Sequence, residues 1–200
     1  MSKSSAAGRN TSEKASLTPA DWERAALELI GDRGVESLRV EPLARQMGVT
    51  KGSFYWHFSS RDALLSQSLA RWEQQDRQQL QQSLSSAEAP VERLKGFVWR
   101  TSRQTLTHAI YAALCSSPDH PSIRPVLQRV TRRRIRHLAT ALAELGLSDE
   151  EARHRANLMY STYVGYLHLQ AQGLLPDQDE QAYDDYVQHI IKTLIENCRE

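Results

Sequence analysis

Residues 50–59 are the part of the chain whose residue types and spacing best fit a chemical task. The segment reads Thr-Lys-Gly-Ser-Phe-Tyr-Trp-His-Phe-Ser, with a cation, hydroxyls, a phenol, an indole and an imidazole around two phenylalanines. Phe54 and Phe58 are four positions apart, so they share one face of a helix, which predicts a buried edge. The other residues form an edge that suits an anionic surface, because lysine and a helix N-terminus bind phosphate and lysine also reaches guanine. The pattern predicts the recognition helix of a helix-turn-helix.

The glycine at position 52 and the aromatic residues after it favour a large partner over solvent. A glycine inside a short helix costs about 1 kcal/mol relative to alanine, and close approach of the backbone to a major groove is a reason to accept that cost. A solvated surface helix is the alternative interpretation. It is less favourable because Tyr55, Trp56 and His57 in succession make an expensive surface unless a partner covers them.

A helix that begins at residues 18–21 is predicted to support this segment. Thr18 can serve as the N-cap, Pro19 fits the first helical position, and Asp21 completes an arrangement like a capping box. Gly34 marks the C-terminal cap. The apolar face, at helical spacing, comprises Trp22, Ala26, Leu29 and Ile30.

A second, shorter helix and a tight turn complete the motif. Pro42 is tolerable only in the first turn of a helix, which places the start near residues 39–41. Gly48 supplies a left-handed turn, and Thr50 caps the next helix. Ser59 and Asp62 then mark the start of a further helix that runs to about residue 84. The apolar face of the short helix comprises Val40, Leu43, Ala44 and Met47.

Residues 43–58, which read Leu-Ala-Arg-Gln-Met-Gly-Val-Thr-Lys-Gly-Ser-Phe-Tyr-Trp-His-Phe, closely resemble the DNA-binding signature of the TetR family of bacterial transcriptional regulators. The resemblance covers about residues 18–72, and the rest of the chain matches only in helix number and length. It implies a homodimer whose paired recognition helices enter successive major grooves of a near-palindromic double-stranded DNA operator. It also implies a C-terminal helical domain that binds a small-molecule effector and releases DNA. The expected function is an effector-responsive, sequence-specific transcriptional regulator, most simply a dimeric repressor.

The resemblance also assigns roles by position. At the second helix the chain departs from the family, because Arg39 stands where relatives often have a threonine cap. The capping hydroxyl is lost there, while a phosphate contact can be gained. The residues expected nearest the bases are Lys51, Gly52 and Ser53, and those expected to hold phosphates are Thr50, Tyr55, His57 and Arg61, with Trp56 at the groove edge.

The charge of the chain is focused and not global. A formal net charge of +1 over 200 residues excludes a globally basic nucleic-acid coat protein, but it does not exclude a local DNA-binding footprint. Such a footprint is present between residues 39 and 61. In that segment only Glu41 opposes the four cations Arg39, Arg45, Lys51 and Arg61.

The rest of the composition indicates a cytoplasmic protein. Cys115 and Cys198 are far apart in a chain without a secretory leader, which points to a reducing compartment. No run of about 18 apolar residues exists, so neither a membrane span nor a membrane partner is expected.

An all-α enzyme and a helical protein-interaction module without DNA binding are the rival hypotheses. The seven histidines show no helical pairing with a carboxylate in a metal-binding register, and neither a nucleophile elbow nor a phosphate loop is present. We therefore predict no catalytic residue, metal or cofactor. An interaction module leaves Gly52 and the aromatic edge unexplained.

The whole chain is predicted to be all-α, without a convincing strand of period two and without an internal repeat. The expected organisation is a flexible tail at 1–17, a helix-turn-helix DNA-binding domain at 18–62, a connecting helix at 63–84 and a helical effector-binding and dimerisation domain at 85–200. Candidate helices in the last part are 90–105, 107–116, 122–145, 149–173 and 180–198, separated mostly by prolines and Gly146.

The last two helices have apolar residues on more than one face, as helices do that pack on two sides. One side is expected to meet the same domain and the other a second subunit in a four-helix bundle. A purely intramolecular core is the alternative. The candidate dimer residues are Ser161, Gly165, Val187, Ile190, Ile191, Leu194 and Ile195.

Two further features carry hypotheses. Six arginines between residues 124 and 136 are predicted to form a solvated face; the alternatives are pairing with the acidic stretch 177–185 or attraction of an anionic effector. An effector pocket needs aromatic surface with a few convergent polar groups. The candidates for it are Trp99, Arg103, Tyr111, Tyr160 and Tyr163, with plain core packing as the alternative.

Overall fold

In the computed structural model, which describes residues 17–84, 88–176 and 179–196, these ranges contain nine α-helices, a short 3-10 helix and no strand, so the expected all-α fold is confirmed. The ends of the helices differ from those expected by a few residues. Most of the expected tail, residues 1–16, and Cys198 lie outside the described residues. In chain order the elements are α1 (Pro19–Arg33), η1 (Val35–Ser37), α2 (Val40–Gln46), α3 (Lys51–Tyr55), α4 (Arg61–Leu84), α5 (Pro90–Ser102), α6 (Thr105–Cys115), α7 (Arg124–Ala143), α8 (Asp149–Ala171) and α9 (Glu180–Leu194).

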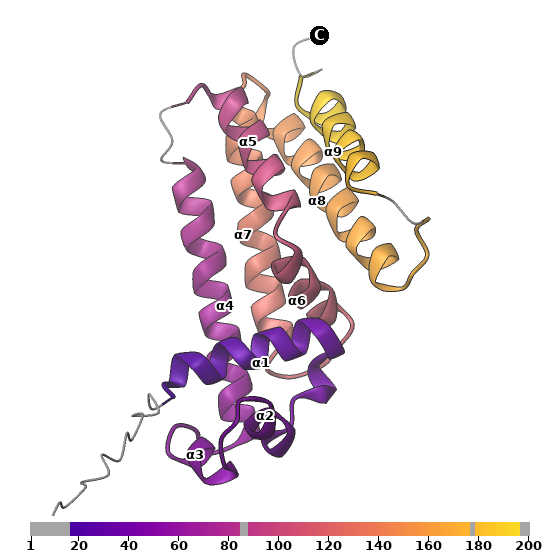
Figure 1. Ribbon diagram of the computed structural model, residues 1–200. Helices are drawn as coiled ribbons and strands as arrows, with labels where there is room; N and C mark the ends of the chain where they lie inside the picture. The colour runs from indigo at the N-terminus through magenta and orange to yellow at the C-terminus, as the bar shows by residue number, and fades with distance from the viewer. Residues whose placement is uncertain (1–16, 85–87, 177–178, 197–200) are drawn as a thin grey trace, which may run out of the picture.

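The helix-turn-helix lies at one end of the molecule, and the long α4 leads from it to the other end (Figure 1). The start of α1 is as predicted: the N–H and the hydroxyl of Thr18 donate to the carboxylate of Asp21 at 2.9 and 2.6 Å. These bonds lower the pKa of Asp21 to about 2. Gly34, at a φ of 79°, caps the other end and donates to the carbonyl of Ile30 at 2.8 Å.

The start of α4 differs from the prediction by one residue. The hydroxyl of Ser60, and not that of Ser59, accepts a hydrogen bond from the backbone N–H of Ala63 at 3.1 Å. A capping side chain must stand two or three residues before the N–H that it satisfies, and the helix begins at Arg61. Ser60 meets that condition, which the spacing of Ser59 and Asp62 did not reveal.

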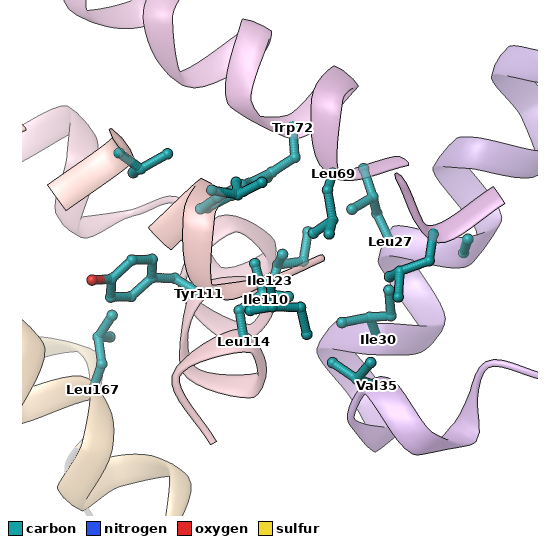
Figure 2. Packing of buried hydrophobic residues seen from close by; sticks show 14 of the residues in the cluster. Leu27, Ile30, Val35, Leu69, Trp72, Ile110, Tyr111, Leu114, Ile123 and Leu167 are labelled. Atoms are coloured by element: carbon teal, nitrogen blue, oxygen red, sulfur yellow. The ribbon is translucent and has the colours of Figure 1, made fainter. Parts of the chain in front are cut away.

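One continuous hydrophobic core joins the two halves of the molecule. Helix α1 packs against both α4 and α6, and α7 packs against α8 and α4. Figure 2 shows Leu27 and Ile30 of α1 beside Leu69 of α4 and Ile110 of α6. The contact between α1 and α6 is close, because a Cβ placed on Gly31 would meet Cγ1 of Ile110 at 3.3 Å. The helix-turn-helix is therefore packed directly on the C-terminal helices.

Between α4 and α7 the structure contains an ion cluster that the sequence did not predict. We call Glu73, Asp76, Arg129, Arg133 and Arg134 the α4–α7 cluster. Glu73 accepts from Arg129 and from Arg133 at 2.6 Å each, and Asp76 accepts from Arg134 at 2.7 Å and from Arg133 at 3.2 Å. Both carboxylates are buried. The expected solvated arginine face is thus wrong for Arg133 and Arg134. Of the six arginines, Arg124, Arg129, Arg132 and Arg136 are exposed, although the charge of Arg129 is paired.

The proposed pairing of the α7 arginines with the acidic stretch 177–185 is not what the structure shows either. Within the described residues, Arg103, after the end of α5, binds that stretch. Its Nη2 contacts Asp184 at 2.7 Å and its Nη1 contacts Glu180 at 3.3 Å. The α7 arginines instead face Glu73 and Asp76, which lie one helical turn apart on α4.

Candidate nucleic-acid interface and ligand cavity

Helix α3 is fixed to the core by one edge, as its spacing predicts. The rings of Phe54 and Phe58 are buried and stack with their centroids 5.6 Å apart. Phe54 also meets Trp22 of α1 edge-on at 5.4 Å. The hydroxyl of Thr50 accepts from the N–H of Ser53 at 3.4 Å, a long bond at the predicted N-cap. The turn before it contains Gly48 at a φ of 69°, a conformation that glycine adopts without strain.

The opposite edge of α3 faces outward. Tyr55 is 55% exposed and Trp56 is 87% exposed, the largest exposure among the large apolar side chains of the described residues. Indole and phenol rings are seldom left in water to this extent without a partner surface. Of the other residues predicted to contact DNA, Arg39, Thr50, Lys51 and Gly52 are exposed, while Ser53, His57 and Arg61 are partly buried.

The ammonium of Lys51 lies 2.6 Å from the carboxylate of Glu41, on α2. The hydrogen bond from Lys51 holds the pKa of Glu41 below its ordinary value, and the same bond raises the pKa of Lys51. Both side chains are at least half exposed. An exposed pair of this kind contributes little to folding, so Lys51 is readily released to an anionic partner.

The fold itself gives no reason for glycine at position 52. Its φ is not positive, and a Cβ there would meet only the hydroxyl of Thr50 at 3.6 Å, an ordinary contact. An alanine would fit and would favour the helix. The packing of the described chain therefore does not explain the glycine. Close approach of the α3 backbone to a partner would explain it.

Arg61 has a structural role that the sequence did not indicate. Its Nε donates to the carbonyl of Leu38 at 2.7 Å, and its Nη2 donates to the carbonyl of Val35 at 3.1 Å. These bonds tie the start of α4 to the segment between α1 and α2. Its Nη1 lies 3.1 Å from the carboxylate of Asp62, which is largely exposed. A phosphate contact by Arg61 stays a prediction, and it has to be made by a guanidinium that already binds two carbonyls.

A cavity of about 120 Å³ lies in the C-terminal half, between α4, α5, α6, α7, α8 and α9. Its wall is largely aromatic and aliphatic. Of the five residues expected in an effector pocket, Tyr160 and Tyr163 line it. The lining residues that the sequence did not single out include Asp76, Phe97, His108, Arg134, Tyr166, Tyr183 and Tyr186.

The other three expected pocket residues lie elsewhere. Tyr111 is buried behind the wall, and its hydroxyl is 2.6 Å from that of Tyr160. Arg103 is exposed and stacks on the ring of Trp99 at 4.7 Å, while its charge is paired with Asp184. Helical spacing predicted that these side chains lie near one another, but it could not show which face of α5 points toward the cavity.

The candidate dimer residues fall into two groups. On α8, the candidates Ser161 and Gly165 are exposed. Leu158 and Leu169, which were not predicted, are exposed on the same face at spacings of three and four, so the four residues form one apolar, small-residue stripe. On α9, Val187, Ile191 and Ile195 are buried against the same chain, and Ile190 lines the cavity. The expectation that Val187, Ile191 and Ile195 face a second subunit is therefore wrong as the chain is folded here. α9 packs against α5. Leu194 is partly buried and also packs on the core.

The described residues lack two features. None of their helices combines the length and the apolar character needed to cross a membrane. They also contain no group of three or more His, Cys, Asp or Glu side chains arranged to hold a metal ion.

Relatives with related sequences match the N-terminal region. One segment is 48% identical over 42 residues to the tetracycline repressor protein class C of Escherichia coli, covering 21% of this chain and 19% of that protein. Another is 36% identical over 59 residues to the HTH-type transcriptional regulator AcrR of Shigella flexneri, covering 30% of this chain and 27% of that protein. The matched segments thus span only about a fifth to a quarter of these relatives.

Solved structures match almost the whole chain. A TetR transcriptional regulator from Legionella pneumophila superposes with a TM-score of 0.75 at 18% identity, over 91% of this chain and 99% of that one. The reduced form of NemR from E. coli gives a TM-score of 0.68 at 22% identity, over 88% and 96%. At such identities the likeness establishes the fold.

Two family descriptions match the sequence itself. Residues 24–67 match the bacterial regulatory proteins of the tetR family, and residues 85–196 match the tetracyclin repressor-like C-terminal domain. The second match alone covers more than half of the chain. The chain therefore belongs to the TetR family of bacterial transcriptional regulators.

Proposed function

We propose that the protein is a sequence-specific, DNA-binding transcriptional regulator that acts as a homodimeric repressor and is released from its operator by a small molecule. The observation that carries the proposal is the outward edge of α3. Phe54 and Phe58 hold the helix by its inner edge, while Lys51, Tyr55 and Trp56 extend into solvent. A cation, a phenol and an indole on one short helix suit the phosphates and base edges of a major groove.

The α8 stripe supports the dimeric part of the proposal. Leu158 and Leu169 are 54% and 40% exposed, and Gly165 lies between them with no atom within 4 Å of the Cβ position. Small residues between larger apolar ones let a second helix approach closely. Two copies joined across this stripe would present two α3 helices, as a near-palindromic operator requires.

The cavity supports the effector-responsive part. It is lined by residues of α4 and α6, the two helices on which α1 packs. His108 of α6 faces the cavity, and the neighbouring Ala109 and Ile110 lie within 3.4 Å of a Cβ position on Gly31 of α1. A ligand that displaces α6 would therefore move α1, because packed interiors transmit small shifts. This gives a physical route from the cavity to the recognition helix.

Selection of bound sequences from a random duplex pool tests the proposal. We expect enrichment of two half-sites related by a two-fold axis, with centres separated by roughly 34–36 Å or a multiple of that distance. Recovery of a single half-site would support DNA binding but contradict the dimeric arrangement. Recovery of no sequence above the starting pool would count against the regulator function itself.

A further inference from the structure

The cavity contains polar atoms that lack partners in an otherwise apolar wall. Within the described chain, Nη1 of Arg134, Nε2 of His108 and the hydroxyl of Tyr163 are buried and make no hydrogen bond. All three residues line the cavity. A buried donor or acceptor without a partner costs about 1–3 kcal/mol, and three such atoms around one cavity mark the place where a ligand would satisfy them.

The three groups are close to one another. The ring of His108 meets that of Tyr163 edge-on, with centroids 5.4 Å apart. Cζ of Arg134 lies 5.9 Å from the centre of the Tyr163 ring. Burial raises the pKa of Tyr163 to about 12, with the positive charge of Arg134 acting in the opposite direction, so the phenol keeps its proton and can donate. Arg134 and Tyr163 can therefore donate to one ligand head group, whereas burial lowers the pKa of His108, so its neutral ring carries no charge that attracts an anion.

The ion cluster beside this end of the cavity carries more positive than negative groups. The α4–α7 cluster combines three guanidinium groups with two carboxylates. Asp76 also lines the cavity, but each of its oxygens is taken, Oδ1 by Arg134 at 2.7 Å and Oδ2 by Arg133 at 3.2 Å. Burial favours the neutral form of Arg134, yet Tyr163, Asp76 and Tyr160 raise its pKa overall, so it stays charged. The unpaired Nη1 of this charged guanidinium can donate a hydrogen bond to an anionic oxygen of a ligand.

The rest of the cavity wall determines which kind of ligand body fits. Aromatic and aliphatic side chains from α5, α8 and α9 line it, among them Phe97, Leu138, Met159, Tyr166 and Val187. An apolar cavity of about 150 Å³ is known to bind benzene, so a cavity of about 120 Å³ holds a body the size of one aromatic ring. We infer that the cavity takes a small aromatic carboxylate, with the oxyanion against Arg134 and Tyr163 and the ring against the apolar wall. This deepens the proposed function, because it rests on the cavity being the effector site.

Three probes with one phenyl ring separate the chemical classes: benzoate, benzyl alcohol and benzylamine. Calorimetric titration of the full chain at pH 7.5, without DNA, is expected to show the carboxylate binding at least tenfold more tightly than the alcohol, and the amine most weakly. Equal affinities for the three probes, a preference for the amine, or no binding of any probe would overturn the inference.

Two matched tyrosine variants locate the head group. Tyr163→Phe removes a hydroxyl that has no partner, and the preference for carboxylate over alcohol should fall by about fivefold or more. Tyr160→Phe removes a hydroxyl that already binds Tyr111, and the preference should persist. If the two variants lose the preference equally, the assignment to Tyr163 is wrong. DNA binding of the same preparations is measured separately. Loss of the carboxylate preference with intact DNA binding contradicts only this inference, whereas absence of DNA binding contradicts the proposed function.

Discussion

Nε of Arg134 on α7 lies 2.7 Å from Oδ1 of Asp76 on α4, and both side chains line the ligand cavity. The pair joins the wall of the cavity to the helix that begins beside the recognition helix. Nearer the start of α4 than Asp76, the side chains of Leu64, Leu65 and Leu69 are buried in the core that holds α1. The α4–α7 cluster thus joins α4 to α7 and also presents a guanidinium to the cavity.

The stability of the cluster should depend on pH. A hydrogen bond from Arg129 lowers the pKa of Glu73 below 4.5 against the effect of burial, and Arg133 adds to the shift. A carboxylate whose pKa is lower in the folded state contributes stability that is fully present above its unfolded pKa and is lost as the pH falls through the folded value. Glu73→Gln should therefore reduce the free energy of unfolding by about 1–3 kcal/mol at pH 7. Urea denaturation of both proteins should show this difference shrinking below about pH 4.5; a difference that grows there would contradict the assignment.

Replacing Gly52 should separate stability from DNA binding. Gly52→Ala adds a methyl group that meets only an ordinary contact within the fold, and alanine favours a helix by about 1 kcal/mol. We expect an unchanged or slightly higher melting temperature together with at least a tenfold loss of affinity for the selected duplex. Unchanged affinity would show that the backbone of α3 does not approach DNA closely.

Glu41 should restrain DNA binding through Lys51. Glu41→Gln removes the charged partner of the ammonium and one negative charge beside the proposed interface. Affinity for the duplex, measured by fluorescence anisotropy at low salt, should rise severalfold, while the free energy of unfolding should hardly change because the pair is exposed. A fall in affinity would mean that the pair positions Lys51 for its contact.

The exposed stripe of α8 should control assembly. Leu158→Glu places a charge on a large exposed side chain at one end of the stripe and should convert a dimer into a monomer in sedimentation experiments at micromolar concentration. Gln75→Glu is a matched control, because it adds the same charge at an exposed position of α4. Loss of the dimer in the control as well would point to general charge repulsion and not to this stripe.

The sequence predicted the features that depend on local spacing. The capping of α1 by Thr18, the left-handed Gly48 and the buried pair Phe54 and Phe58 all follow from distances of a few residues along one helix or turn. The family resemblance at residues 43–58 is of the same local kind, and the family match confirms it.

The features that the sequence did not predict depend on which distant helices meet. Arg129 and Glu73 are 56 residues apart, so the spacing of charges on α7 alone indicated a solvated face. The same limit applies to α9, where Val187 and Ile191 pack inward although their pattern suited a second subunit equally well. His108 and Arg134 could be recognised as cavity residues only once α6 and α7 were seen to face α8.

Titration of the selected duplex with the wild-type protein, Lys51→Ala and Tyr55→Ala at 50–200 mM salt tests the central claim most directly. For a dimer that contacts six or more phosphates, wild-type affinity should fall by roughly 10³-fold over this range. Lys51→Ala should weaken binding and reduce the salt slope by about 2 per dimer, and Tyr55→Ala should weaken binding at least tenfold, with both variants as stable as the wild type. Wild-type affinity that is insensitive to salt, or variants that bind as tightly as the wild type, would show that the outward edge of α3 is not the DNA-binding surface.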